Sequence, residues 1–264
     1  MKPSPKISVV TVTYNSAATL EKTILSVLNQ TYPNIEYIII DGGSTDGTVD
    51  IIEKYADRLT YWVSEPDKGI YDAMNKGIDA ATGDYINFMN ADDTFYDNEV
   101  IKKIFSTEYD DDVIYGKTLK ITPNYTYIEK NRSIPFLNEG MAFGHQASFS
   151  KTELMKKIKF DLKYKSAADY DFFHTVMKKN GSFREVPFIV SIFNACDGFS
   201  ARNRKLSWKE VDEINGRSSS RFWSVKYVLR CIDYDFRRFV KSVLPQSFVK
   251  KINIRNIKSD LERE

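Results

Sequence analysis

The sequence has only two cysteines, Cys196 and Cys231, among its 264 residues. They form no CxxC pair and no zinc-binding pattern, which excludes a disulfide framework and favours a reducing compartment. No run approaches the roughly 18 apolar residues that a membrane-spanning helix needs, and the N-terminal stretch is no basic-then-apolar signal peptide. We therefore expect a cytoplasmic protein that is attached, at most, to the inner face of a membrane.

Two nucleotide-binding motifs are also absent. The sequence contains neither GxGxxG nor GxxxxGK[ST], so neither the dinucleotide fingerprint nor a phosphate-binding P-loop is available. The two signs of charge are unevenly distributed along the chain. Residues 201–264 carry 16 Lys and Arg against 8 Asp and Glu, a net charge of +8, which leaves −6 for residues 1–200. The acidic part is expected to carry the chemistry, and the basic part to face an anionic partner.

Hydrophobic residues make up 42% of the chain, enough for a large core. Continuous apolar runs predict strands buried on both faces over residues 6–13, 35–40 and 85–89, with a shorter strand over 59–64. Apolar residues at helical spacing predict helices over 19–29, 48–55 and 72–81. This alternation predicts βαβ units, a parallel sheet and a ligand site at the carboxyl ends of its strands.

The second half of the chain predicts more strands and three helical segments. Strands are expected over 113–116 and 118–128, antiparallel around Pro123, and over 143–149 and 186–193. Helical segments are expected over 99–105, 153–157 and 167–179.

Polar side chains end three of the predicted strands. Tyr14 and Asn15 follow the first, Asp41 ends the second, and Asn90-Ala91-Asp92-Asp93 ends the strand over 85–89. Two adjacent carboxylates repel each other, and a divalent cation with oxygen ligands would hold them together and bring a phosphate with it. A solvated turn with helix-capping aspartates is the alternative.

Several long stretches, in order, resemble family 2 glycosyltransferases, which have the GT-A fold. The matching stretches are residues 9–15, 26–32, 39–48, 65–78 and 90–93, with shorter matches at 144–146 and 168–171. The resemblance implies an α/β fold with a Rossmann-like, mostly parallel sheet flanked by helices. It implies a nucleotide-sugar-binding half over 1–95 and an acceptor-side half over 96–205. Residues 206–264 match no pattern of the family, and their composition predicts a basic, amphipathic, helical extension.

The resemblance also implies an inverting transfer from a nucleotide-diphospho-sugar, with UDP as the expected nucleotide. The base and ribose contacts would be Thr13, Tyr14, Asn15 and Asp41, with Lys76 at the base or phosphate. Asp93 would bind Mn²⁺ or Mg²⁺, with Asp92 as a helper or ribose contact. The first position of this element is Asn90, where the family pattern has Asp.

The resemblance places the general base at Asp169, with Asp171 as the rival. Two residues apart on a helix, the two side chains face different directions, so only one can face the site. The alternative is that both are first-turn carboxylates that interact with the helix dipole. His145 and Gln146 are expected to contact the acceptor or the diphosphate, and a structural role is the alternative for His145.

The basic C-terminal part leaves two interpretations open. Its mixture of apolar and basic residues from 221 to 249 suits an anionic membrane surface, or a helix packed on the domain or on a second subunit. A basic loop over 197–205 is expected to close over the diphosphate. The expected function is transfer to a glycan or lipid-linked acceptor in surface polysaccharide biosynthesis. A sugar nucleotidyltransferase and a non-catalytic nucleotide-sugar-binding module are the alternatives, and nucleic-acid binding is not expected.

Overall fold

The computed structural model describes residues 4–123, 125–195 and 203–244. The chain divides into two compact units, Met1–Arg202 and Asn203–Glu264. Most of the loop expected to close over the diphosphate, and the last part of the predicted amphipathic segment, lie outside the described residues.

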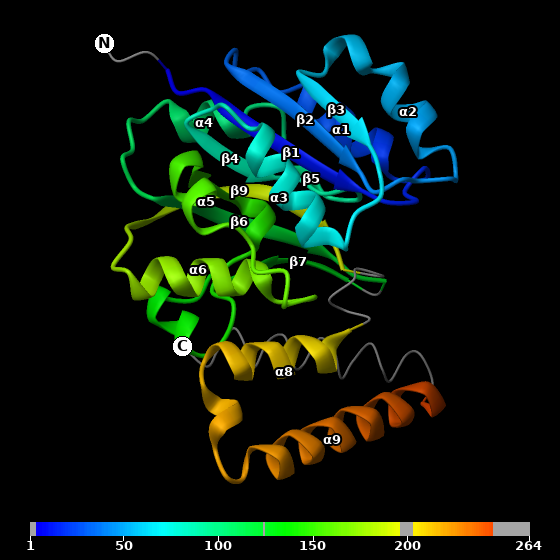
Figure 1. The fold of residues 1–264 in the computed structure, drawn as a ribbon, viewed down its shortest axis with the longest axis vertical. Helices are drawn as coiled ribbons and strands as arrows, with labels where there is room; N and C mark the ends of the chain where they lie inside the picture. The colour runs from blue at the N-terminus through cyan, green and yellow to red at the C-terminus, as the bar shows by residue number, and fades with distance from the viewer. Residues whose placement is uncertain (1–3, 124, 196–202, 245–264) are drawn as a thin grey trace. The chain divides into compact units, whose positions relative to one another are not determined.

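The first unit is built on one sheet that is flanked by helices (Figure 1). Its strands are β1 (Ile7–Thr13), β2 (Ile35–Asp41), β3 (Tyr61–Ser64), β4 (Tyr85–Phe88), β5 (Thr94–Phe95), β6 (Val113–Ile121), β7 (Thr126–Glu129), β8 (Ser148–Lys151) and β9 (Phe183–Asn194). Its helices are α1 (Leu20–Leu28), α2 (Thr48–Lys54), α3 (Ile70–Ala80), α4 (Val100–Phe105), α5 (Thr152–Ile158) and α6 (Ala168–Lys178). The described strands run in the order β3-β2-β1-β4-β8-β6-β9-β5, and β7 pairs with β6.

The N-terminal half of this sheet is parallel, as the sequence predicts. β1 lies between β2 and β4, and β2 pairs with β3, all in parallel register. Every residue of β1 is buried, because its successive side chains enter two cores. Val9 packs in the cluster that α1 and α4 share, whereas Val10 faces α3, where Gly77 leaves room for its methyl groups.

The other half of the sheet is mixed and differs from the prediction at two points. The expected break near Gly116 is a register shift within one strand, β6, since β9 approaches too closely at this point for a side chain. The strand expected over 143–149 begins only at Ser148. A 3-10 turn, His145–Ala147, precedes it, and the Ser148 hydroxyl closes this turn by donating to the His145 carbonyl at 2.6 Å.

The second unit, as far as it is described, is helical, as expected. It contains α8 (Arg204–Ile214), a 3-10 turn (Arg217–Ser219) and the 21-residue α9 (Trp223–Val243). None of the helices in the described parts of the chain is both long and apolar enough to cross a bilayer.

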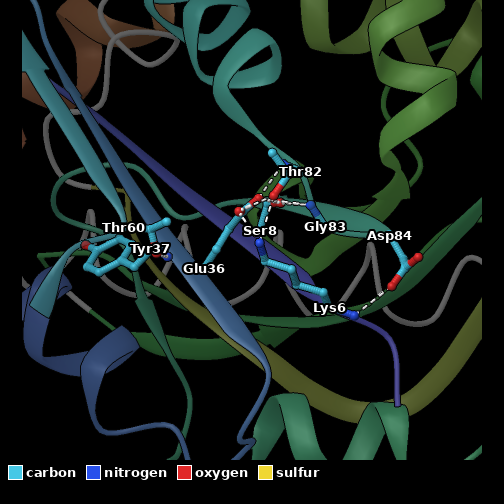
Figure 2. Close-up of polar contacts among 8 residues, drawn as sticks. All are labelled: Lys6, Ser8, Glu36, Tyr37, Thr60, Thr82, Gly83 and Asp84. Carbon is cyan, nitrogen blue, oxygen red and sulfur yellow. Dashed lines mark hydrogen bonds and ion pairs between the residues drawn. The ribbon is translucent and has the colours of Figure 1, made fainter. Parts of the chain in front are cut away.

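A buried carboxylate holds the strands together at the end of the sheet where β1 and β2 begin. Glu36 accepts hydrogen bonds from Ser8, from the backbone and hydroxyl of Thr82 and from the Gly83 N–H, and it pairs with Lys6 at 2.7 Å (Figure 2). Burial alone would raise the pKa of Glu36. These donors outweigh burial and lower the pKa from 4.5 to about 2.

We predict that Glu36→Gln lowers the free energy of unfolding by about 3 kcal/mol at neutral pH, because a pKa difference of this size corresponds to roughly that energy. The folded-state pKa lies below the ordinary value, so the contribution is complete above pH 4.5 and is lost between pH 4.5 and 2. Denaturant unfolding of both proteins across this range measures it.

The exposed Glu53→Gln is the matched control, and we expect it to change stability by less than about 0.5 kcal/mol. A stability difference between Glu36→Gln and the parent that stays constant from pH 7 to pH 2 would show that the Glu36 charge is not the cause.

Candidate active site

Three of the predicted polar strand ends lie at one edge of the sheet. Thr13 and Asp41 are register partners at the carboxyl ends of β1 and β2. The segment after β4 remains beside β1, because the Ala91 N–H donates to the Val12 carbonyl at 3.2 Å. The edge predicted to bind a ligand therefore gathers Thr13, Asp41 and the turn over residues 90–93.

That turn is tightly held. The Asp93 N–H donates to the Asn90 carbonyl at 2.9 Å, and Asp92 adopts a positive φ of 85°. Thr23 of α1 donates to the Asp93 carbonyl at 2.8 Å and accepts from the Asp92 N–H at 3.1 Å. Asn194 of β9 donates to the Asp92 carboxylate at 3.2 Å. The turn is thus fixed from two elements, and its two carboxylates have different surroundings.

The Asp93 side chain is buried, and within the described residues its carboxylate accepts no hydrogen bond. Burial raises the pKa of Asp93 from 3.8 to about 7; His145 opposes this rise and the neighbouring Asp92 adds to it. A buried carboxylate without donors is costly unless a positive charge compensates it.

The surroundings of Asp93 fit a divalent cation. The side-chain oxygen of Asn90 is also buried and has no hydrogen-bond partner among the described residues, and amide and carboxylate oxygens are the ligands that Mn²⁺ and Mg²⁺ prefer. In the described parts of the chain no group of three or more His, Cys, Asp or Glu residues could hold a metal ion.

Asp169, in the first turn of α6, lies against side chains from two distant segments. The Tyr71 hydroxyl of α3 donates to one carboxylate oxygen at 2.8 Å, and Nδ1 of His145 lies 3.1 Å from the other. Both donors hold Asp169 in one orientation. A small cavity beside Asp169 and His145 is lined mainly by apolar side chains, which strengthens these contacts.

His145 connects Asp169 to the turn after β4. Its Nε2 lies 3.3 Å from Nδ2 of Asn90. An amide nitrogen only donates, so Nε2 accepts here and Nδ1–H points to Asp169. When Nε2 is protonated, the contact instead requires the Asn90 amide to turn its oxygen toward it.

The two partners shift each other's pKa values in opposite directions. Burial lowers the pKa of His145, but Asp169 and Asp93 outweigh it and raise the pKa above 6.5. Burial raises the pKa of Asp169, whereas His145 and Tyr71 lower it below 3.8. Asp169 is therefore held as a carboxylate.

Asp171 faces different neighbours. Burial raises its pKa above the ordinary value, with Lys163 lowering it and Asp161 raising it further. These neighbours differ from Tyr71 and His145, the residues that contact Asp169. The structure thus brings Asp169, but not its rival, to His145.

Asp41 organises a loop rather than projecting into open space. It is fully buried, and its oxygens accept hydrogen bonds from the Gly43 and Ser44 N–H groups and from the Ser44 and Ser64 hydroxyls at 2.5–3.0 Å. The contact with base or ribose predicted for Asp41 stays a prediction.

The remaining predicted donor contacts surround this loop. Tyr14 is exposed, and Asn15, at a positive φ of 47°, accepts from the Thr45 N–H at 2.9 Å. The Thr13 hydroxyl is buried and has no hydrogen-bond partner in the part of the chain that the structure describes. Lys76 pairs with Glu65 at 2.7 Å, so it fastens the segment between β3 and α3.

Four residues at this edge were given no role in the sequence analysis. Tyr71 donates to Asp169, and Asn194 donates to Asp92. Asn90 contacts His145. Asp67 and Tyr14 lie so close to Gly42 that a side chain there would clash with them. Tyr71 and Asp67 belong to the matching stretch over 65–78, which is the one signal that could have found them.

Gln146 is buried, and its backbone carbonyl accepts from Asn87 at 3.1 Å.

Two solved structures have a similar fold. TarS of S. aureus (residues 1–349), in complex with UDP-GlcNAc, superposes with a TM-score of 0.64 at 20% identity, over 79% of this chain and 66% of its own. A mannosyltransferase of Pyrobaculum calidifontis, in complex with GDP-Man and Mn²⁺, gives 0.64 at 17% identity, over 82% and 65%. These likenesses confirm the expected α/β fold of GT-A type.

Sequence comparison supports the same family. A PGL/p-HBAD biosynthesis glycosyltransferase of Mycobacterium bovis is 33% identical over 179 residues, which are 64% of this chain and 68% of the relative. The model of glycosyl transferase family 2 matches residues 8–182, the part of the chain that holds the turn after β4, His145 and Asp169. The chain therefore belongs to glycosyl transferase family 2.

Proposed function

We propose that this family 2 glycosyltransferase moves a sugar from a nucleotide-diphospho-sugar to an acceptor hydroxyl with inversion at the anomeric carbon. UDP is the nucleotide we propose, and Mn²⁺ or Mg²⁺ the cation. The observation that carries the proposal is the position of His145, whose ring touches both Asp169 and Asn90. A base candidate and a cation-binding turn are thereby adjacent.

The donor side of the reaction rests on the turn after β4. Asp93 would hold the cation, with Asp92 and the Asn90 oxygen beside it. A bound divalent cation stabilises the negative charge that develops on the leaving diphosphate. Thr13, Tyr14, Asn15, Asp41 and Lys76 remain our proposed contacts with the base, ribose and phosphates.

The acceptor side rests on Asp169. Its carboxylate takes the proton of the attacking hydroxyl, and Tyr71 and His145 orient it for this step. The acceptor oxygen then forms the new bond to the anomeric carbon as the bond to the diphosphate breaks, in a single displacement without a covalent enzyme intermediate. His145 and Gln146 lie in the 3-10 turn before β8 and are proposed to face acceptor or diphosphate.

We further propose that the acceptor is a glycan or a lipid-linked sugar in surface polysaccharide biosynthesis, and that the protein works at the inner face of a membrane. Residues 1–95 would bind the donor and residues 96–205 the acceptor. The basic extension over 206–264 would bring the enzyme to the membrane or to a second copy.

A donor screen tests the function. We expect release of nucleoside diphosphate from UDP-sugars, in preference to GDP- and dTDP-sugars, only when Mn²⁺ or Mg²⁺ is present. A sugar nucleotidyltransferase would instead release pyrophosphate from a nucleoside triphosphate, and a binding module would bind donor without turnover. Either result would contradict the proposal.

We predict that Asp93→Asn lowers cation-dependent turnover by about 100-fold or more, because the neutral amide loses the charge that holds the cation. Turnover and the affinity for Mn²⁺ in the presence of UDP are the measurements. The exposed Asp57→Asn is the control and should retain the parent's values. An unchanged Mn²⁺ affinity in Asp93→Asn would remove this residue from the site.

We predict that Asp169→Asn lowers kcat for transfer by about 10² to 10⁴-fold with little change in the KM for donor, since the amide cannot accept the proton. Asp171→Asn, the matched variant on the same helix, should stay within a few-fold of the parent. Single-turnover transfer assays of both variants decide between them, and the reverse order would make Asp171 the base.

A further inference from the structure

Figure 1 shows α9 as a long helix that follows α8 in the chain. Large apolar side chains are exposed along this helix. Their exposed fractions lie between 52% and 68%, for Phe222, Val225, Val228, Leu229, Ile232, Phe236, Phe239 and Val243. Exposed apolar rows of this length mark an interaction surface. We call these eight residues the α9 apolar face.

The spacing puts the eight residues on one side of the helix. Apart from the adjacent Val228 and Leu229, successive members are three or four residues apart, so they form a single stripe that begins at the N-cap Phe222 and runs along α9. The opposite side of α9 packs on α8. Trp208 meets Tyr234 edge to face with centroids 5.4 Å apart, and the Tyr227 hydroxyl donates to the Lys205 carbonyl at 3.1 Å. Within this unit α8 therefore supports the helix and leaves the apolar face uncovered.

Basic side chains border the apolar face. Lys226 and Arg237 follow it along one side on the helical wheel. Arg237 pairs with Asp233 at 2.9 Å and Lys205 pairs with Asp235 at 2.6 Å, so these two ion pairs add no net charge near the borders of the face. Residues 201–264 keep a net charge of +8.

We propose that the α9 apolar face binds an anionic lipid bilayer, with the helix lying in the plane of the interface. Its apolar side chains enter the acyl boundary while the bordering Lys and Arg side chains meet lipid phosphates. The charge favours this occupant over a second copy of the chain. Two segments of net charge +8 repel each other, whereas an anionic surface attracts each of them.

The consequence for catalysis rests on the proposed function. A protein held at a lipid surface meets an acceptor anchored in that surface at a high local concentration. The binding itself depends only on α9. It can therefore be measured without any glycosyl transfer, and its failure leaves the donor chemistry untouched.

Vesicle co-sedimentation of the full-length chain tests the proposal. We expect binding to vesicles that contain phosphatidylglycerol and little binding to pure phosphatidylcholine vesicles, with affinity that falls as salt rises. The triple variant Leu229→Gln/Ile232→Gln/Phe236→Gln should lose binding. Lys226→Gln/Arg237→Gln should weaken it by about tenfold or more.

Ser224→Gln/Ser242→Gln, which lies off the apolar face, is the matched control and should bind like the parent. Donor hydrolysis by each variant reports that the first unit is folded. No binding to anionic vesicles, or equal binding by the triple variant, would overturn the proposal. A dimer in sedimentation velocity that the triple variant dissociates, without vesicle binding, would assign the face to a second copy instead.

Discussion

The burial of the Asp93 carboxylate is the constraint on which the site depends. A buried ionised carboxylate requires either hydrogen-bond donors or a nearby positive charge. Among the described residues no donor reaches the Asp93 carboxylate, and burial raises its pKa to about 7. The surrounding backbone is nevertheless rigid, since the turn is fastened to α1 and β9. The fold thus holds an acidic group that hydrogen bonds from the described residues do not compensate, and this supports our proposal of a cation there.

In two other buried carboxylates of the same unit, Glu36 and Asp41, hydrogen-bond donors compensate the negative charge. Glu36 has donors from Ser8, Thr82 and Gly83 as well as an ion pair with Lys6, and its pKa falls to about 2. Asp41 accepts four hydrogen bonds from its own loop and from β3. Both carboxylates therefore hold the structure together. Asp169, with two donors, remains charged but keeps lone pairs for a substrate proton, which suits a base.

The sequence predicts the parallel half of the sheet well, because continuous apolar runs such as Ile7–Thr13 end abruptly in polar residues. It predicts the segment around His145 poorly. Phe143 and Phe149 suggest a strand, but the Ser148 hydroxyl closes a turn between them that apolar periodicity does not reveal. The pairing of Asp169 with Tyr71 joins residues 98 positions apart, and no local pattern specifies it. Which of Asp169 and Asp171 faces His145 likewise depends on the orientation of α6, which no local pattern specifies.

The two ends of the parallel strands serve different purposes. At the amino end every hydrogen-bonding atom drawn around Glu36 helps to join β1, β2 and the segment before β4. At the carboxyl end, the Thr13 hydroxyl and the Asn90 amide oxygen are buried and have no hydrogen-bond partner among the described residues. Such groups cost stability and are rare in folded proteins. The other two atoms of this kind in the described part of the chain belong to Asn87 and Thr152. The two at the carboxyl end support our proposal that this edge keeps polar groups ready for a ligand.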